Sequence, residues 1–158
     1  MSKTNLTEKF WREFRAENPD VDADEPYQVW YFGSDSKMAK ELVDLVLRGK
    51  KKATASLAEV NKLKPEAAPI DDGYSVVTDY EGNPQGLIQT TEIRILPFTE
   101  VDAQFAFDEG EGDQTLEDWR EGHWKYFTKE AEELNVEFNK KSLVACERFK
   151  LLFPKAKE

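Results

Sequence analysis

Apolar side chains follow two different spacings along this chain, and the order of those spacings limits the folds it can adopt. Three segments carry apolar residues at the spacing of an amphipathic helix: Asn5–Ala16, Lys37–Arg48 and Thr115–Leu134. Five others are rich in β-branched and aromatic residues and predict strands: Tyr27–Phe32, Ala53–Leu57, Gly73–Tyr80, Leu87–Leu96 and Ser142–Phe153. After Gly49 the pattern is mainly that of strands. We therefore expect an α+β fold, a small mixed β-barrel with helices packed outside, and not a sheet of βαβ units.

The ends of the helical segments carry residues that are typical of helix limits. Asn5 can cap the first helix, and Glu8 lies three residues further on, which is the spacing of a capping box. An acidic linker, Asp20–Glu25, follows that helix. Gly49 is expected to end the second helix, because glycine readily takes the left-handed conformation found there.

The charge of the chain argues against general binding to nucleic acids. Its 158 residues, the size of a single domain, include 32 acidic and 22 basic side chains, for a net charge of −10. Binding through phosphates needs a positive surface. We therefore expect no bulk nonspecific DNA binding, and any nucleic-acid ligand must meet a local basic patch or a base-sized pocket.

Several features point to the cytoplasm. No apolar run is long enough to span a membrane, and no apolar signal segment follows the N-terminus. Cys146 is the single cysteine, so no disulfide can form within the chain. We expect a cytoplasmic protein with no membrane partner.

The segment Gly49–Ser56 is the first candidate site. Lys50, Lys51 and Lys52 follow the second helix, where cations favour the negative end of the helix dipole. That structural role leaves Thr54 and Ser56 unexplained, and these hydroxyls would share one face of a strand. A lysine beside them could bind phosphate, or could activate a hydroxyl if its amine were neutral.

The acidic segment Phe107–Asp113 is the second candidate. Its four carboxylates repel one another, so one of them could keep its proton near neutral pH. A solvated loop at a helix start is the structural alternative. A calcium loop fails, because the twelfth position from Asp108 is Trp119 and not Glu. With one cysteine and with His123 as the one histidine, on the apolar side of a helix, we expect no metal and no cofactor.

Six short blocks, taken together and in order, resemble the ASCH-domain family, a branch of the PUA-like β-barrel superfamily. They are Trp30-Tyr31-Phe32-Gly33, Leu47-Arg48-Gly49-Lys50-Lys51, Ala53-Thr54-Ala55-Ser56-Leu57, Gln89-Thr90-Thr91-Glu92, Asp108-Glu109-Gly110-Glu111-Gly112-Asp113 and Cys146-Glu147-Arg148-Phe149. The likeness runs from about Trp30 to Phe153. The first helix resembles an extension found in one bacterial subgroup, which implies an N-terminal extension with its linker at 1–25 and an ASCH domain at 26–158.

The resemblance implies two kinds of activity for the candidate site. The family is associated with RNA binding. One relative is an amidohydrolase acting on N4-acetylcytidine, and another is described as a ribonuclease. The amidohydrolase carries a G-x-K-x-x-T motif and a downstream glutamate. The motif falls here on Gly49, Lys51 and Thr54, and the glutamate falls on Glu111 or Glu109.

Three hypotheses follow. In a binding module for RNA or a modified nucleoside or nucleotide, Lys50–Lys52 and Arg148 would hold phosphates, while Thr54 and Ser56 would bond a base or ribose. In a hydrolase, Thr54 would attack an acyl group, Lys51 would take its proton, and Glu111 would protonate the leaving group. In the third hypothesis, the chain is an interaction domain that has lost any ligand. A base needs a lowered pKa, whereas nearby carboxylates would raise that of Lys51.

Overall fold

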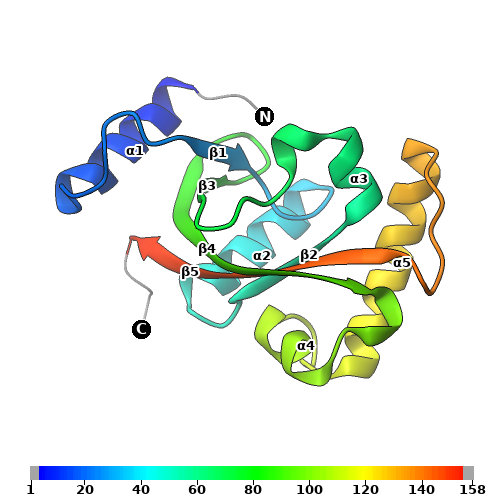
Figure 1. Cartoon of the computed structure of the whole chain (residues 1–158). Helices are drawn as coiled ribbons and strands as arrows, with labels where there is room; N and C mark the ends of the chain where they lie inside the picture. Colours follow the sequence, from blue (N-terminus) through cyan, green and yellow to red (C-terminus); the bar gives the residue numbers. More distant parts are fainter. Residues whose placement is uncertain (1–3, 155–158) are drawn as a thin grey trace.

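The computed structural model describes residues 4–154 as one five-stranded sheet with five α-helices around it (Figure 1). The strands are β1 (Tyr27–Trp30), β2 (Ala53–Leu57), β3 (Tyr74–Thr78), β4 (Pro84–Pro97) and β5 (Leu143–Phe153). The α-helices are α1 (Asn5–Glu17), α2 (Ser36–Leu47), α3 (Ala58–Leu63), α4 (Ala103–Glu109) and α5 (Leu116–Leu134), and the 3-10 helices are η1 (Pro65–Ala67) and η2 (Phe98–Glu100). No helix in this range is long and apolar enough to cross a membrane.

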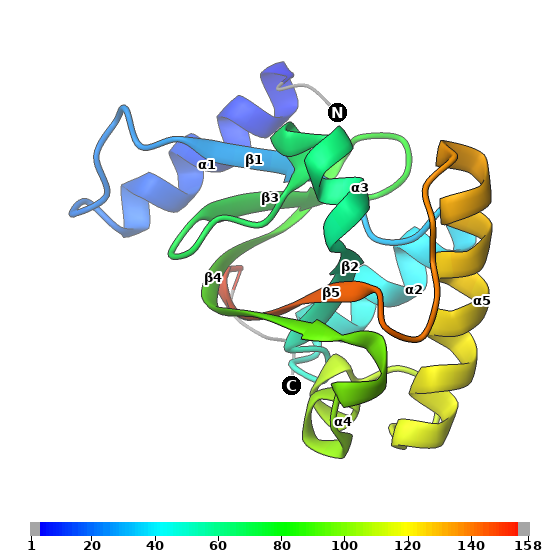
Figure 2. The same ribbon diagram turned by 45° about the vertical axis from the view of Figure 1, so that its right-hand side comes forward.

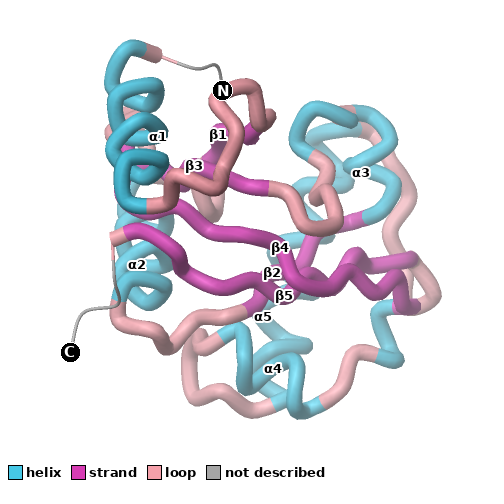
Figure 3. The backbone as a smooth tube through the Cα atoms, turned by 60° about the vertical axis from the view of Figure 1, so that its left-hand side comes forward, coloured by secondary structure: helices cyan, strands magenta, loops and turns pink. Residues whose placement is uncertain are grey.

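The sheet is mixed and open. Its strand order is β1-β3-β4-β5-β2, with β1 parallel to β3 and the other neighbours antiparallel. The long strand β4 curves from its β3-paired part to its β5-paired part (Figure 2), and Figure 3 shows β4 and β5 side by side. Register shifts at Leu87/Ile88 and Thr90/Glu92 lie along this curve.

The predicted α+β fold with outer helices is confirmed, with one correction: the sheet does not close, so it only approximates the expected small mixed barrel. Within residues 4–154 the edge strands β1 and β2 do not pair with each other. Instead α3 contacts β2, and η1 contacts β1. Helical residues therefore lie at the two edges where a barrel would have backbone pairing.

Alternating side chains pack the sheet against helices on both faces. Val76 and Leu87 are buried in one cluster with Trp11 and Phe14 of α1. Their neighbours Val77 and Ile88 are buried in another cluster, with Val43 and Val46 of α2. Because successive strand residues point to opposite faces, α1 and α2 cover opposite faces of the same strands.

Helix ends follow the expected chemistry, with one shift. The first helix is capped by Thr4 and not by Asn5: the Thr4 hydroxyl accepts from the backbone N–H of Thr7 at 3.2 Å, and Thr7 completes the capping box in place of Glu8. Threonine is among the residues preferred at the N-cap of a helix. Gly49 has φ of +76°, which is the left-handed conformation expected just beyond α2.

The acidic segment is only partly a loop, which is a second correction. Its first residues belong to α4, whose N-cap Asp102 accepts from the N–H of Phe105 at 2.9 Å. Gly110, at φ +71°, ends the helix. Phe105 and Glu109 are buried against the rest of the protein. This tertiary packing stabilises α4, and it cannot be recognised from the seven-residue sequence of such a short helix.

The N-terminal helix shares a core with the rest of the chain. Trp11 stacks on Tyr27 with ring centroids 4.5 Å apart, and Phe14 lies edge-on to Phe153 at 6.3 Å. The division at residue 25 remains a prediction, and these contacts make α1 a structural part of the same apolar cluster.

We expect Phe14→Ala to lower the free energy of unfolding by about 3–5 kcal/mol, because it removes a ring buried between α1 and the sheet. Phe14 is 1% exposed, whereas Phe107 is 56% exposed. Phe107→Ala is therefore the matched control and should change stability by no more than about 0.5 kcal/mol. Urea denaturation measures both. Equal, small losses in the two variants would show that α1 does not belong to the cooperative unit.

Candidate functional site

Lys51 lies where the end of α2 meets the end of α4. Its backbone N–H donates to the carbonyl of Leu45, and the next N–H, of Lys52, donates to the carbonyl of Asp108 at 2.8 Å. Gly110 permits this approach, because a Cβ there would lie 2.5 Å from the carbonyl oxygen of Lys50. The two predicted site segments are thus joined through their backbones.

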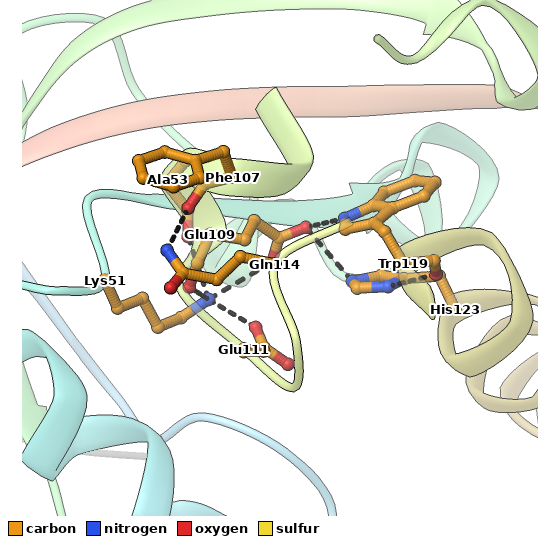
Figure 4. A network of polar contacts seen from close by, with 8 residues as sticks. All are labelled: Lys51, Ala53, Phe107, Glu109, Glu111, Gln114, Trp119 and His123. Carbon is orange, nitrogen blue, oxygen red and sulfur yellow. Dashed lines mark hydrogen bonds and ion pairs between the residues drawn. The ribbon is translucent and has the colours of Figure 1, made fainter. Parts of the chain in front are cut away.

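The Lys51 ammonium is buried and fully engaged. Its Nζ donates to the carbonyl of Ala53 at 2.8 Å, to Oε1 of Glu109 at 3.1 Å and to Oε2 of Glu111 at 2.6 Å (Figure 4). Burial opposes its charge, but the two carboxylates outweigh burial and raise the pKa of Lys51. Lys51 therefore keeps its proton in this arrangement.

Glu109 links this lysine to α5. Its Oε2 accepts from the indole N–H of Trp119 and lies 3.1 Å from Nε2 of His123. Burial favours the neutral acid, yet His123 and Lys51 outweigh burial and hold the pKa of Glu109 well below its usual range. Glu109 is therefore the ionised centre of the network.

His123 is cationic in the same network. Its Nδ1 lies 2.9 Å from the carbonyl oxygen of Trp119, and its Nε2 faces Glu109. Both partners only accept, so both ring nitrogens carry hydrogen. Burial lowers its pKa, but the Glu109 carboxylate has the stronger effect and raises the pKa of His123.

Glu111 is the carboxyl whose pKa moves upward. Burial is the main cause, opposed by Lys51 and reinforced by the charge of Glu109. Its side chain is 31% exposed, compared with 1% for Glu109. Glu111 is thus the more accessible carboxyl of the pair and the one that takes up a proton more readily.

Two adjoining hollows lie beside the network. The first, here called the α5 pocket, has a volume of about 290 Å³, and its lining includes Phe32, Thr54, Glu109, Glu111, Trp119, His123 and Tyr126. The second, here called the β1 cleft, has a volume of about 630 Å³, and its lining includes Tyr27, Trp30, Tyr31, Phe32, Thr54, Ser56, Lys64, Tyr126 and Glu147. Thr54 and Tyr126 line both, so the hollows meet at these residues.

The structure brings four of the predicted site residues together. Thr54, Glu109 and Glu111 line the α5 pocket, and Lys51 is ion-paired to both glutamates. Ser56 lies in the β1 cleft, where its hydroxyl accepts from Asn61 at 3.0 Å.

Three predicted ligand-binding residues lie elsewhere. Lys50 and Lys52 are exposed and line neither hollow. Arg148 pairs with Asp108 at 2.9 Å and lies over the Phe105 ring at 5.3 Å. Arg148 therefore helps to hold α4 against β5, and a role for these three cations in binding phosphate remains a prediction.

Sequence reasoning missed several pocket residues. Trp119, His123 and Tyr126 of α5 line the α5 pocket, whereas the sequence placed His123 only on the apolar side of a helix and did not single out Tyr126. Glu147 was noted only within a family block, although a carboxylate in an apolar strand is itself a signal. It is 6% exposed, and burial raises its pKa.

A metal ion does not fit this network well. Glu109, Glu111 and His123 offer ligand atoms within 4.8 Å of one another. However, Lys51 already occupies the space between the two carboxylates. A metal would have to displace a buried ammonium, so the geometry favours an ion-pair network.

We expect the imidazole pKa of His123 to lie above its ordinary value of about 6.5, and to fall in the Glu109→Gln variant because burial then acts with less opposition. His123 is the only histidine, so one NMR titration reads it directly. Glu117→Gln removes an exposed charge on the same helix and is the control. A His123 pKa that is unchanged in Glu109→Gln would contradict the assignment.

The raised pKa of His123 also makes the stability of the protein depend on pH. Because the folded-state pKa is raised, the protonated ring contributes stability that is fully present below the unfolded-state pKa and lost as pH rises through the folded-state value. The stability gap between wild type and His123→Gln should therefore narrow on going from mildly acidic to alkaline pH.

Comparison with known proteins places the chain in a family. The ASCH domain matches residues 28–152. A crystal structure of an ASCH domain from Lactobacillus crispatus JV V101 is similar, with 30% identity, coverage of 96% of this chain and 97% of that one, and a TM-score of 0.85. The crystal structure of protein EF3133 from Enterococcus faecalis V583 is also similar, with 32% identity, coverage of 91% of this chain and 86% of that one, and a TM-score of 0.81.

A more distant likeness extends to fold alone. Hypothetical protein PH0355 is 16% identical, covers 79% of this chain and 97% of that one, and has a TM-score of 0.53. Comparison with curated proteins gives no match. The family match and the two closer structures agree with the blocks found in the sequence, and the chain belongs to the ASCH domain family, which has a PUA-like fold.

Proposed function

We propose that this ASCH domain binds RNA or a nucleic-acid-derived ligand by taking a nucleobase into the joined α5 pocket and β1 cleft. ASCH domains are commonly linked to RNA binding. The observation that carries the proposal is the lining of the hollows, in which aromatic rings alternate with hydroxyl and carboxyl groups.

Aromatic rings supply surfaces on which a base can stack. Trp30 ends β1, Tyr31 directly follows it, and Tyr126 comes from α5; all three are partly exposed and line the β1 cleft. Stacking on such rings contributes about 1–3 kcal/mol per base in proteins that bind single strands. The hydroxyl of Thr54, at the junction, can bond the edge of a base or a ribose.

The distribution of charge favours a base over a phosphate inside the hollows. Lys64 is the one lysine or arginine among their lining residues within the part of the chain described. The buried Lys51 is neutralised by Glu109 and Glu111. Phosphates would therefore stay outside, where Lys50 and Lys52 are exposed.

We expect nucleosides to bind the wild-type protein, and Thr54→Val to weaken that binding by roughly 0.5–1.5 kcal/mol, the net value of one hydrogen bond. Valine keeps the shape and removes the hydroxyl. Calorimetry measures the affinities. Thr99→Val, on a residue that lines neither hollow, is the control. A loss that is equal in the two variants would place the ligand elsewhere.

The salt dependence of binding to short RNAs gives a second test of the base-led binding mode. Each phosphate contact on a single strand contributes about 0.7 to the slope of log affinity against log salt. We expect a shallow slope, equivalent to a few contacts. A slope equivalent to six or more would contradict base-led binding and would require a larger basic surface.

A hydrolase is the second candidate, and one contact favours it. Lys51 Nζ lies 2.6 Å from Glu111 Oε2, and Thr54 lines the same pocket as Glu111. The raised pKa of Lys51 opposes a role as base, so this mechanism requires one proton to pass from Lys51 to Glu111 when the ligand binds, which leaves a neutral amine and a protonated acid. Lys51 could then take the Thr54 proton as the hydroxyl attacks an acyl carbon, while Glu111 protonates the departing amine. Water would then cleave the acyl–threonine ester, which releases the carboxylic acid and restores the hydroxyl.

The hydrolase predicts turnover of an acylated nucleoside. We expect wild-type protein with this activity to release cytidine from N4-acetylcytidine, and Thr54→Ala to abolish release because the nucleophile is lost. Thr54→Ser keeps a hydroxyl and should retain turnover. Chromatography of the product decides. Undiminished release by Thr54→Ala would eliminate the threonine mechanism, and no release by wild type would leave the binding function alone.

A further inference from the structure

Glu147 is a buried carboxyl that neither proposed activity uses. It lies on β5, directly opposite Thr54 of β2 in the strand register. Opposed residues of an antiparallel pair extend from the same face of a sheet. Both side chains line the β1 cleft, so the acid and the hydroxyl are presented together at its wall.

One oxygen of Glu147 is held and the other is not. Oε2 accepts from the hydroxyl of Thr90 at 2.6 Å. Within residues 4–154, Glu147 forms no ion pair, and its Oε1 has no hydrogen-bond partner. Among the described residues the one buried side-chain oxygen without a partner is Thr128 Oγ1, so Oε1 of Glu147 is accessible from the cleft, where a donor on a ligand can reach it.

The fixed oxygen sets what the idle one can do. Burial raises the pKa of Glu147, whereas the Thr90 hydroxyl, which donates to Oε2, favours the ionised form. An ionised carboxyl has acceptors only. The group that fits Oε1 is therefore an N–H donor, and Thr54 beside it can donate or accept in turn.

We infer that Glu147 and Thr54 read the edge of the bound nucleobase and select bases that carry an amino group over their oxo counterparts. The inference rests on the proposed base-binding function. An amino N–H of a cytosine- or adenine-type base would donate to Oε1, as glutamate accepts from the cytosine amino group in nucleic-acid recognition. The oxo counterpart would place its oxygen against Oε1, acceptor against acceptor.

Matched pairs of nucleosides test the inference on wild-type protein. Cytidine and uridine differ at this edge by amino against oxo, and so do adenosine and inosine. Because burial raises the pKa of Glu147, the pairs are compared in mildly alkaline buffer, which favours its ionised form. We expect the amino member of at least one pair to bind roughly 5- to 150-fold more tightly, the discrimination of a well-formed base contact.

Two variants assign the preference to Glu147. Glu147→Gln keeps the size of the side chain and can still accept from Thr90, but it offers an amide N–H to the cleft. We expect the preference to disappear or to invert toward the oxo member. Glu117→Gln removes an exposed carboxylate that lines neither hollow and should leave the preference unchanged.

The outcomes separate the inference from the function beneath it. Wild-type protein that binds both members of each pair equally would overturn the inference and leave base binding intact. A preference that survives in folded Glu147→Gln would overturn the role of this residue. Absence of binding to all four nucleosides would overturn both. If Glu147→Gln does not fold, the wild-type preference alone supports or overturns amino selection.

Discussion

The buried ammonium of Lys51 is the constraint on which the site depends. Moving a charged amine out of water costs several kcal/mol, and that cost is met only where partners surround it. Here two carboxylates and a backbone carbonyl do so. They come from β2, from the end of α4 and from the turn that follows. Removing one partner from such a pair typically costs about 3–5 kcal/mol, so the network fixes these elements relative to one another.

The network also decides the character of the hollows. Lys51 is ion-paired with Glu109 and Glu111, and His123 is paired with Glu109, so neither charge is free to meet a ligand. Much of the remaining lining consists of aromatic rings, hydroxyls and carboxyls. A phosphate would meet no free cation in the α5 pocket, within the part of the chain described. A planar, weakly charged base meets ring faces and hydrogen-bonding edges. The acidity of the whole chain, at −10, agrees with this division.

The sequence predicted elements whose signal is local. The strand Ala53–Leu57 has the bounds that were expected, and the site segments do meet. The helix α4 was missed because Glu109 counts as solvated in any local pattern. Its burial depends on Lys51, 58 residues earlier in the chain, and on two α5 side chains. The open barrel has a comparable reason. The strand pattern alone suggested that the edge strands would pair with each other, but α3 contacts β2 and η1 contacts β1.

Two carboxyl groups on either side of Thr54 have opposite roles because their neighbours differ. Glu111 faces a lysine and belongs to a network of balanced charge, whereas Glu147 faces a hydroxyl and keeps one oxygen unpaired. In the proposed binding mode, a ligand that spans Thr54 would meet a proton-exchanging group at one end and a fixed acceptor at the other. That asymmetry would orient the ligand. The base edge would pair with Glu147, and in the hydrolase mechanism the bond to be cleaved must then lie toward Glu111.

A base amino group that carries an acyl substituent offers one N–H and one reactive carbonyl on the same nitrogen. The spacing between the two carboxyls then limits whether one pose serves both recognition and cleavage, because an N–H held at Glu147 fixes where the carbonyl lies.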